Sequence, residues 1–247
     1  MNYDKTIDFL NRYKAIFQEN GEQLWHEKEL IYSNFIKRFV DERPNALKKE
    51  REIASTYNLF SILKIDFSEV RFHTPILANL LNPTGSHGQG LEFYNKFIET
   101  CLKKEHQEKF LKVTSFDLLM SSEKRKGGEQ IDILLYCCNP QNRFAIIIEN
   151  KIWAKDQPKQ LYRYYKYAKD SLGLATENIC IIYLKPNKKP PDLDNLSDKE
   201  KRELNVVLIQ IEYGEHILSF LKRCSIGATK VKETIEQYIL TIQALPL

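Results

Sequence analysis

Two apolar segments joined by a short polar turn constrain the fold of this chain more than any other feature. Residues 131–138 and 143–150 are rich in aliphatic side chains, and residues 139–142 (Asn-Pro-Gln-Asn) separate them. Asn at the first turn position and Pro at the second favour a type I turn, because proline presets φ there. Apolar residues fall on both faces of each segment, so we expect a hairpin of two buried strands.

The register of this hairpin predicts that two acids face each other. A turn centred between Pro140 and Gln141 places Asp132 directly opposite Glu149, with Cβ atoms about 4.5–5.5 Å apart. Lys151 lies two residues beyond Glu149, and the period of two along a strand puts it on the same face. Two facing carboxylates in an apolar setting repel each other and are costly to bury without a compensating cation.

A hard divalent cation with oxygen ligands, such as Mg2+, is the natural compensator, so the pattern indicates a metal-dependent hydrolysis site. The simpler alternative is a solvated rim of the sheet with a weak surface ion pair. That alternative would be preferred for Glu149 and Lys151 alone, because such a short motif discriminates poorly. The opposed Asp132 and the buried isoleucine run favour the metal site.

Hydrophobic periodicity predicts the remaining elements. We expect helices over residues 74–81, 91–104, 157–169 (with Asp156 as its N-cap), 214–224 and 229–244, further strands over 113–120, 179–184 and 206–211, and a polar linker over 185–201. Strand, helix and strand after Glu149 imply a right-handed crossover and a parallel pair, while the hairpin is antiparallel. The fold class is therefore α/β, with a mixed β-sheet flanked by helices on both faces.

The first 65 residues show helical periodicity, so we expect an N-terminal helical extension over 1–65 and an α/β core over 66–247. The extension suits a packing layer, a dimerisation surface or a DNA clamp, and the sequence does not choose among them.

Composition excludes several other classes. Five cysteines without regular spacing indicate reduced thiols and a cytoplasmic location. No apolar stretch approaches 18 residues, so no membrane span is expected. Nine glycines make a glycine-rich phosphate loop a poor candidate, and no nucleophile elbow supports a Ser-His-Asp triad. The net charge of +4 permits a polyanionic partner without arguing for one.

Residues 131–134 (Ile-Asp-Ile-Leu), the turn, and residues 147–152 (Ile-Ile-Glu-Asn-Lys-Ile) resemble the core motif of the PD-(D/E)XK nuclease superfamily. Segments on either side extend the resemblance to about residues 69–167. Residues 69–74, 77–83 and 85–88 are similar to the N-terminal signature of one bacterial branch, and residues 153–157 and 160–164 to its glutamine helix. Ile131 departs from the pattern, because the superfamily has proline there.

The resemblance implies a restriction-endonuclease-like fold and a site for Mg2+ or Mn2+. Asp132 and Glu149 would be metal ligands, and the carbonyl of Asn150 a further one. Lys151 would orient or deprotonate the attacking water and stabilise charge on the phosphorane. Glu69 matches an additional acid that completes the metal shell, although an acid favoured by a helix dipole is an equally good interpretation.

By the same resemblance Gln157 and Gln160 would line the site from the following helix. A solvated helix face is the competing interpretation for Gln160.

Basic residues follow the acidic motif. Lys159, Arg163 and Lys166 fall at i, i+4 and i+7 on one helix face, Lys155 precedes them, and tyrosines at 162, 164, 165 and 167 interleave. Basic and aromatic side chains together suit phosphate contacts and base stacking. A charged outer face with some tyrosines in the core explains the stripe alone better, but beside an acidic metal site the stripe supports a nucleic-acid partner. Asp156 and Asp170 are the acids expected to oppose it.

The function predicted is that of a Mg2+-dependent phosphodiesterase, an endodeoxyribonuclease acting in genome defence or repair. The alternative is a catalytically silent module that uses a nuclease fold to bind nucleic acid or to assemble. An RNA substrate, the target and a homo-oligomeric state are left open by the sequence.

Overall fold

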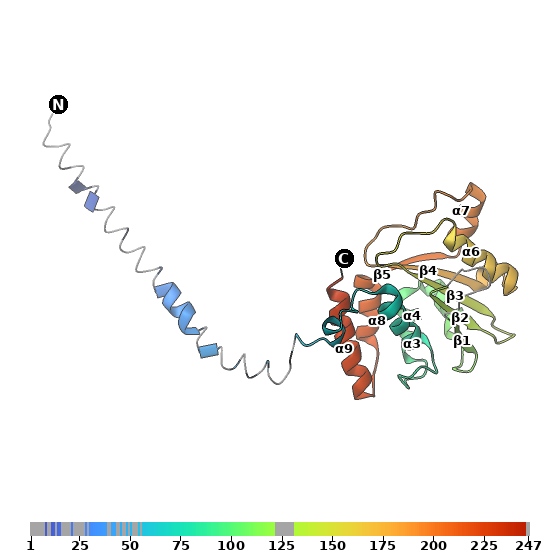
Figure 1. Cartoon of the computed structure of the whole chain (residues 1–247), viewed down its shortest axis with the longest axis horizontal. Helices are drawn as coiled ribbons and strands as arrows, with labels where there is room; N and C mark the ends of the chain where they lie inside the picture. The colour runs from blue at the N-terminus through green and yellow to red at the C-terminus, as the bar shows by residue number, and fades with distance from the viewer. Residues whose placement is uncertain are drawn as a thin grey trace, which may run out of the picture. The chain divides into compact units, whose positions relative to one another are not determined.

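The computed structural model describes residues 56–121 and 131–245, together with scattered positions between 8 and 54. By its internal contacts the chain divides into two units, Met1–Tyr57 and Asn58–Leu247. Figure 1 shows the labelled sheet and helices of the second unit. In the first unit the described positions between 8 and 50 are helical, including residues 30–38. The second unit begins earlier than the expected boundary at residue 66. Every helix in the described part of the chain is too short or too polar to cross a membrane.

A five-stranded mixed sheet forms the centre of the second unit. Its strands lie in chain order: β1 (Leu118–Ser121), β2 (Ile133–Cys137), β3 (Phe144–Asn150), β4 (Ile179–Lys185) and β5 (Leu208–Glu212). The pairs β1–β2 and β2–β3 are antiparallel, whereas β3–β4 and β4–β5 are parallel. This mixture of an antiparallel hairpin and parallel crossovers confirms the expected fold class.

The hairpin has the register that its turn predicts. Ile133 pairs with Ile148 and Leu134 with Ile147. In the turn, the Asn142 N–H donates to the Asn139 carbonyl at 2.9 Å, and the Asn139 side chain accepts from the Gln141 N–H at 3.0 Å. The side chain of Asn139 thus stabilises the turn that sets the pairing.

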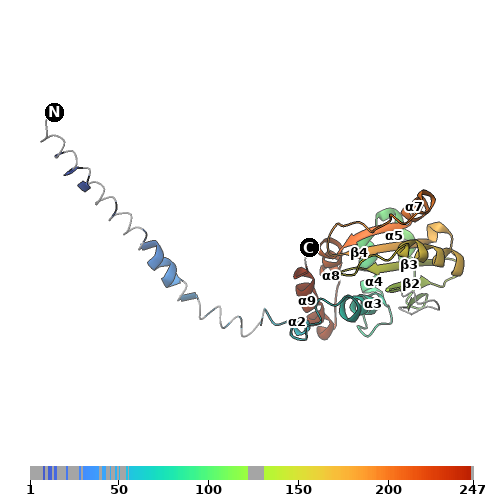
Figure 2. The ribbon, with the colours of Figure 1, turned by 45° about the horizontal axis from the view of Figure 1, so that its top comes forward.

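Helices cover both faces of the sheet (Figures 1 and 2). One face packs on α3 (Thr74–Leu81), α4 (Glu92–Cys101), α5 (Lys104–Leu111), the π-helical turn η4 (Tyr213–Ile217), α8 (Leu218–Arg223) and α9 (Thr229–Gln243). The other packs on α6 (Gln160–Lys166), its π-helical continuation η2 (Tyr167–Ser171) and α7 (Asp198–Asn205). Strand residues alternate between the two cores: Ile146 and Ile148 of β3 join the first, and Ala145 and Ile147 the second.

Short elements complete the second unit. They are α2 (Leu59–Ile62), the π-helical turn η1 (Glu69–His73) and the 3-10 helix η3 (Thr176–Asn178). The helix expected over 74–81 is confirmed with the same bounds as α3. Of the two expected C-terminal helices, the first, over 214–224, is formed by η4 together with α8, and the second, over 229–244, is α9.

Three expectations about local structure are wrong. The helix expected over 91–104 ends at Cys101 as α4, and the separate helix α5 follows it up to Leu111. Strand β1 covers only the end of the strand expected over 113–120. Charged residues dominate α5, so its single buried side chain, Phe110, gives a weak periodic signal. Part of the expected polar linker is α7, which Ser197 and Glu200 begin with a capping box.

The third error concerns Asp156. Helix α6 begins at Gln160, after Lys159 adopts a left-handed φ of 57°. Asp156 therefore does not cap the helix. Its carboxylate accepts from the Tyr183 hydroxyl at 2.7 Å and from the Asp192 N–H at 3.0 Å. A tertiary partner thus replaced the local role that the sequence suggested.

Candidate active site

Asp132 and Glu149 lie where the β2–β3 hairpin ends. Asp132 directly precedes β2, and its Oδ2 accepts from the backbone N–H of Asn150 at 2.9 Å. By the alternation of the strands, Glu149 shares a sheet face with Ile147, toward α6. Glu149 is 1% exposed. The hairpin therefore brings both acids to one end of the sheet.

Burial perturbs both carboxyl groups. Desolvation raises the pKa of Asp132 to about 6, and the charge of Glu69 adds to this rise while the Asn150 N–H and Lys151 oppose it. Desolvation also raises the pKa of Glu149 to about 7, reinforced by the charge of Asp132 and opposed by Lys151 and Tyr164. Desolvated acids whose pKa values are raised further by a neighbouring acid are typical of functional sites.

Lys151 provides a positive charge at this point. Its Nζ lies 2.6 Å from Glu149 Oε1, and the residue is 5% exposed. Burial would lower the pKa of Lys151, but Glu149, Glu69 and Asp132 outweigh it, so the pKa is raised. The amine is consequently protonated at neutral pH.

Glu69 begins η1, where the Ser68 side chain caps the turn by accepting from the Arg71 N–H. The Glu69 Oε2 accepts from the backbone N–H of Ile152 at 2.7 Å and of Trp153 at 3.4 Å. The Glu69 carboxylate thus links η1 to the backbone of the two residues that follow Lys151. A first-turn acid favoured by the helix dipole explains its position in η1 but not this contact.

Gln160 reaches the acids through a tyrosine. Its Nε2 donates to the Tyr164 hydroxyl at 2.9 Å, and that hydroxyl donates to Glu149 Oε2 at 2.8 Å. Both residues are buried, so the solvated-face interpretation of Gln160 is wrong. The sequence suggested Tyr164 only as a stacking or core residue. The four-residue spacing from Gln160, which puts both side chains on one helix face, was the signal available for its role.

The side chain of Asn150 anchors the end of β3. It is fully buried, donates to Thr74 Oγ1 at 3.0 Å and accepts from the Tyr213 hydroxyl at 2.8 Å. These bonds connect α3 and η4 to the strand that carries Glu149. The sequence indicated only the Asn150 carbonyl, and nothing local identified the side-chain partners.

The basic stripe is more fully paired than expected. Lys159 lies 3.0 Å from Glu200 of α7, an acid distant in sequence, and Lys166 lies 2.7 Å from Asp170. Arg163 contacts the carbonyl of Pro158 and the side chain of Gln157. Lys155 lines a cleft formed by the segments 152–156 and 185–194. Gln157, which was expected to line the site, is exposed, and its side-chain oxygen accepts from Arg163.

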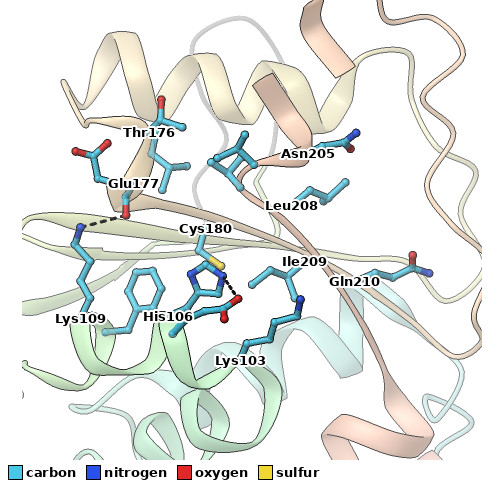
Figure 3. A pocket seen from close by; sticks show the side chains of 15 residues that line it. Lys103, His106, Lys109, Thr176, Glu177, Cys180, Asn205, Leu208, Ile209 and Gln210 are labelled. Carbon is cyan, nitrogen blue, oxygen red and sulfur yellow. Dashed lines mark hydrogen bonds and ion pairs between the residues drawn. The ribbon is translucent and has the colours of Figure 1, made fainter. Parts of the chain in front are cut away.

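A second cavity of about 660 Å3 lies elsewhere (Figure 3). It opens between α5 and the beginnings of β4 and β5, whereas Glu149 is at the end of β3, which runs parallel to β4. Among the residues that line this cavity, Lys109 of α5 donates to the Glu177 carbonyl of η3 at 3.1 Å. This cavity is therefore separate from the acidic site.

The donor set at the acids suits a hard cation. The carboxylates of Glu149, which is buried, and Asp132, which is half-buried, have pKa values raised by desolvation and by neighbouring acids, so both gain from a nearby positive charge. Within residues 56–121 and 131–245, no group of three or more histidine, cysteine, aspartate or glutamate side chains is placed to hold a metal alone. A cation here would depend on carboxylates together with main-chain oxygen and water.

Comparison with known families agrees with this geometry. A family model described as the PD-(D/E)XK nuclease superfamily matches residues 57–241, well over half of the chain. Searches of curated proteins and of solved structures gave no match. The matched range contains the hairpin, both acids, Lys151, Glu69 and α6. The chain belongs to the PD-(D/E)XK nuclease superfamily.

Proposed function

We propose that this protein is a divalent-metal-dependent nuclease that hydrolyses phosphodiester bonds in DNA, cutting within strands. The observation that carries the proposal is the cluster at the end of the hairpin. There Lys151 lies 2.6 Å from Glu149, and Asp132 is close enough to raise the pKa of Glu149. A structural ion pair needs one acid, so the second, half-buried acid supports a site built for a further cation.

Asp132 and Glu149, with the carbonyl of Asn150, are the residues that would hold Mg2+ or Mn2+. When bound, such an ion neutralises phosphate charge and lowers the pKa of a coordinated water. Glu69 holds the backbone after Lys151 by accepting from Ile152 and Trp153, which supports the position of the lysine.

Lys151 acts on the water and the phosphate. Because its pKa is raised, its ammonium is a hydrogen-bond donor at neutral pH rather than a base. It therefore orients the attacking water and stabilises the negative charge that develops on the phosphate oxygens. Tyr164 and Gln160 fix the Glu149 carboxylate from α6.

The test is cleavage of closed circular and linear DNA by the purified full chain, with Mg2+, with Mn2+ and with a chelator. Cutting of the closed circle requires an endonuclease, because the circle has no ends. We expect Lys151→Ala to lower the rate by about a hundredfold or more while DNA binding is retained. Lys103→Ala, an exposed lysine at the separate cavity, is the matched control and should cleave like the wild type.

Asp132→Asn should lose both cleavage and metal binding measured by calorimetric titration. Equal cleavage by the wild type and Asp132→Asn would refute the proposal. A wild type that binds DNA but neither Mg2+ nor Mn2+ would identify a catalytically silent module in its place.

A further inference from the structure

An exposed tryptophan stands beside the acidic site. Trp153 is 59% exposed, although it lies only two residues after Lys151. Its backbone N–H donates to Glu69 Oε2, and its indole Nε1–H donates to the Phe67 carbonyl at 3.2 Å. The residue is thus held by its backbone and by its ring nitrogen, while much of its surface faces solvent. A single exposed aromatic side chain is ordinary, but one that is held in place next to the candidate active site is suited to contact a ligand.

A second ring accompanies it. Phe67 is 49% exposed, and the centroids of the two rings lie 6.4 Å apart at an interplanar angle of 56°. The exposed rings flank Glu69, whose carboxylate accepts from the Trp153 backbone. The rings therefore lie next to one acid of the candidate site.

Trp153 also lines a cleft of about 740 Å3, which we name the Trp153 cleft. Its walls are the segment 152–156 and the segment 185–194. Asp156 joins the walls by accepting from the Tyr183 hydroxyl and from the Asp192 N–H. Gln210 of β5 further secures the second wall by donating to the Lys189 carbonyl at 3.0 Å. The cleft is therefore formed by tertiary contacts.

Three lysines and three aspartates line the cleft: Lys155, Lys185 and Lys189, and Asp156, Asp192 and Asp194. Both oxygens of Asp156 and one of Asp192 accept hydrogen bonds from the protein. Lys185 lies over the Tyr183 ring, 5.2 Å from its centroid. The lysines are suited to contact a phosphate backbone, but the balance of charge alone does not select a ligand.

The exposed aromatic rings indicate which ligand the cleft binds. We infer that the Trp153 cleft binds a single-stranded segment of the DNA substrate, with a base stacked on Trp153; this inference rests on the proposed function. A ring can stack on a base only where that base is unpaired and separated from its neighbour. In a continuous duplex both faces of each base are covered, and Trp153 would meet only the backbone. A protein partner seated on these rings would lie next to Glu69 of the candidate active site, where a nuclease must leave room for its substrate.

Binding can be tested without turnover. The chain has two tryptophans, so Trp25→Phe leaves Trp153 as the sole indole fluorophore. In a chelator, short oligo(dT) should quench its fluorescence several-fold more strongly than a blunt duplex at equal nucleotide concentration. The absence of quenching by oligo(dT), or equal quenching by the duplex, would overturn the inference. Because no cleavage is involved, this result is independent of the proposed activity.

Kinetics provide the second test. With Mg2+ or Mn2+, Trp153→Ala should raise the KM for single-stranded DNA about tenfold, and Trp153→Phe should restore most of the loss. Phe116→Ala is the matched control: that ring is 89% exposed but precedes β1 at the turn end of the hairpin. An unchanged KM in Trp153→Ala, with cleavage intact, would overturn the inference and leave the proposed function standing. A wild-type dimer that Trp153→Ala dissociates in sedimentation would show that the rings form a protein interface, and would also overturn it.

Discussion

The hydroxyl of Tyr164 donates to Glu149 Oε2 at 2.8 Å and thereby connects α6 to the acidic end of β3. Tyr164 is itself held by Gln160, one helical turn earlier. The other oxygen of Glu149 faces Lys151 at 2.6 Å. The carboxylate is thus fixed from two elements, a strand end and a helix that follows it in sequence.

Tyr164→Phe should slow metal-dependent cleavage about tenfold, because Glu149 loses the donor that orients one of its oxygens. It should also lower the free energy of unfolding by about 1–3 kcal/mol, since a buried acceptor loses its partner. Urea unfolding and initial cleavage rates measure the two effects. The control is Tyr162→Phe, which removes another hydroxyl from the same helix, one that donates to Glu203 at 2.9 Å. Equal rate losses in both variants would contradict a specific role for Tyr164.

Asp132→Asn should stabilise the metal-free protein at pH 8. The carboxylate is desolvated there and lies near Glu69 and Glu149, and asparagine retains an oxygen for the Asn150 N–H. Burial raises the pKa of Asp132 from 3.8 to about 6. At 1.36 kcal/mol per pKa unit, the gain in the free energy of unfolding is on the order of 3 kcal/mol. Thermal unfolding in a chelator measures it.

The pH dependence of this gain follows from its sign. Between pH 3.8 and about 6 the folded state binds more protons than the unfolded state, because the folded pKa of Asp132 is raised. As pH rises through this window the Asp132 side chain ionises and lowers the free energy of unfolding of the wild type. The advantage of Asp132→Asn should therefore grow from near zero at pH 3.8 to its maximum above about pH 6. Added Mg2+ should raise the Tm of the wild type at pH 8 and not that of the variant. A variant less stable than the wild type at pH 8 in a chelator would contradict this account.

Local chemistry made the hairpin predictable. A proline at the second turn position and two aliphatic runs determine both the pairing and its register, so the approach of Asp132 to Glu149 followed from the sequence. The same strand rule placed Lys151 near Glu149. These are interactions between residues close in sequence, for which spacing along a strand is sufficient.

Partners distant in sequence were not predictable. Asp156 looked like a helix cap, but it binds Tyr183 and the backbone of Asp192. The pairing of Lys159 with Glu200 depends on how α7 packs against α6, which no local pattern encodes. Tyr213 likewise reaches Asn150 from across the fold. In each case a polar side chain found a tertiary partner that outweighed its local preference.

Tyr213→Phe should lower the free energy of unfolding by about 1–3 kcal/mol. The Tyr213 hydroxyl donates to the Asn150 side chain where both residues are fully buried, so its removal leaves a buried amide oxygen without this donor. Chemical denaturation measures the loss. Tyr136→Phe serves as the control, because that hydroxyl accepts from Arg143 at an exposed position. A loss no larger than that of the control would show that the Asn150 side chain does not depend on Tyr213.

Lys155→Ala should weaken DNA binding more than Lys159→Ala, although both lysines belong to the same basic segment. Lys155 lines the Trp153 cleft, whereas Lys159 forms an ion pair with Glu200 that already offsets its charge. Removing a lysine that binds one phosphate reduces the slope of log affinity against log salt by about one. We therefore expect fluorescence anisotropy titrations at several salt concentrations to show a reduced slope for Lys155→Ala and an almost unchanged slope for Lys159→Ala. A reduced slope for Lys159→Ala with an unchanged slope for Lys155→Ala would place the DNA along the helical stripe instead of in the cleft.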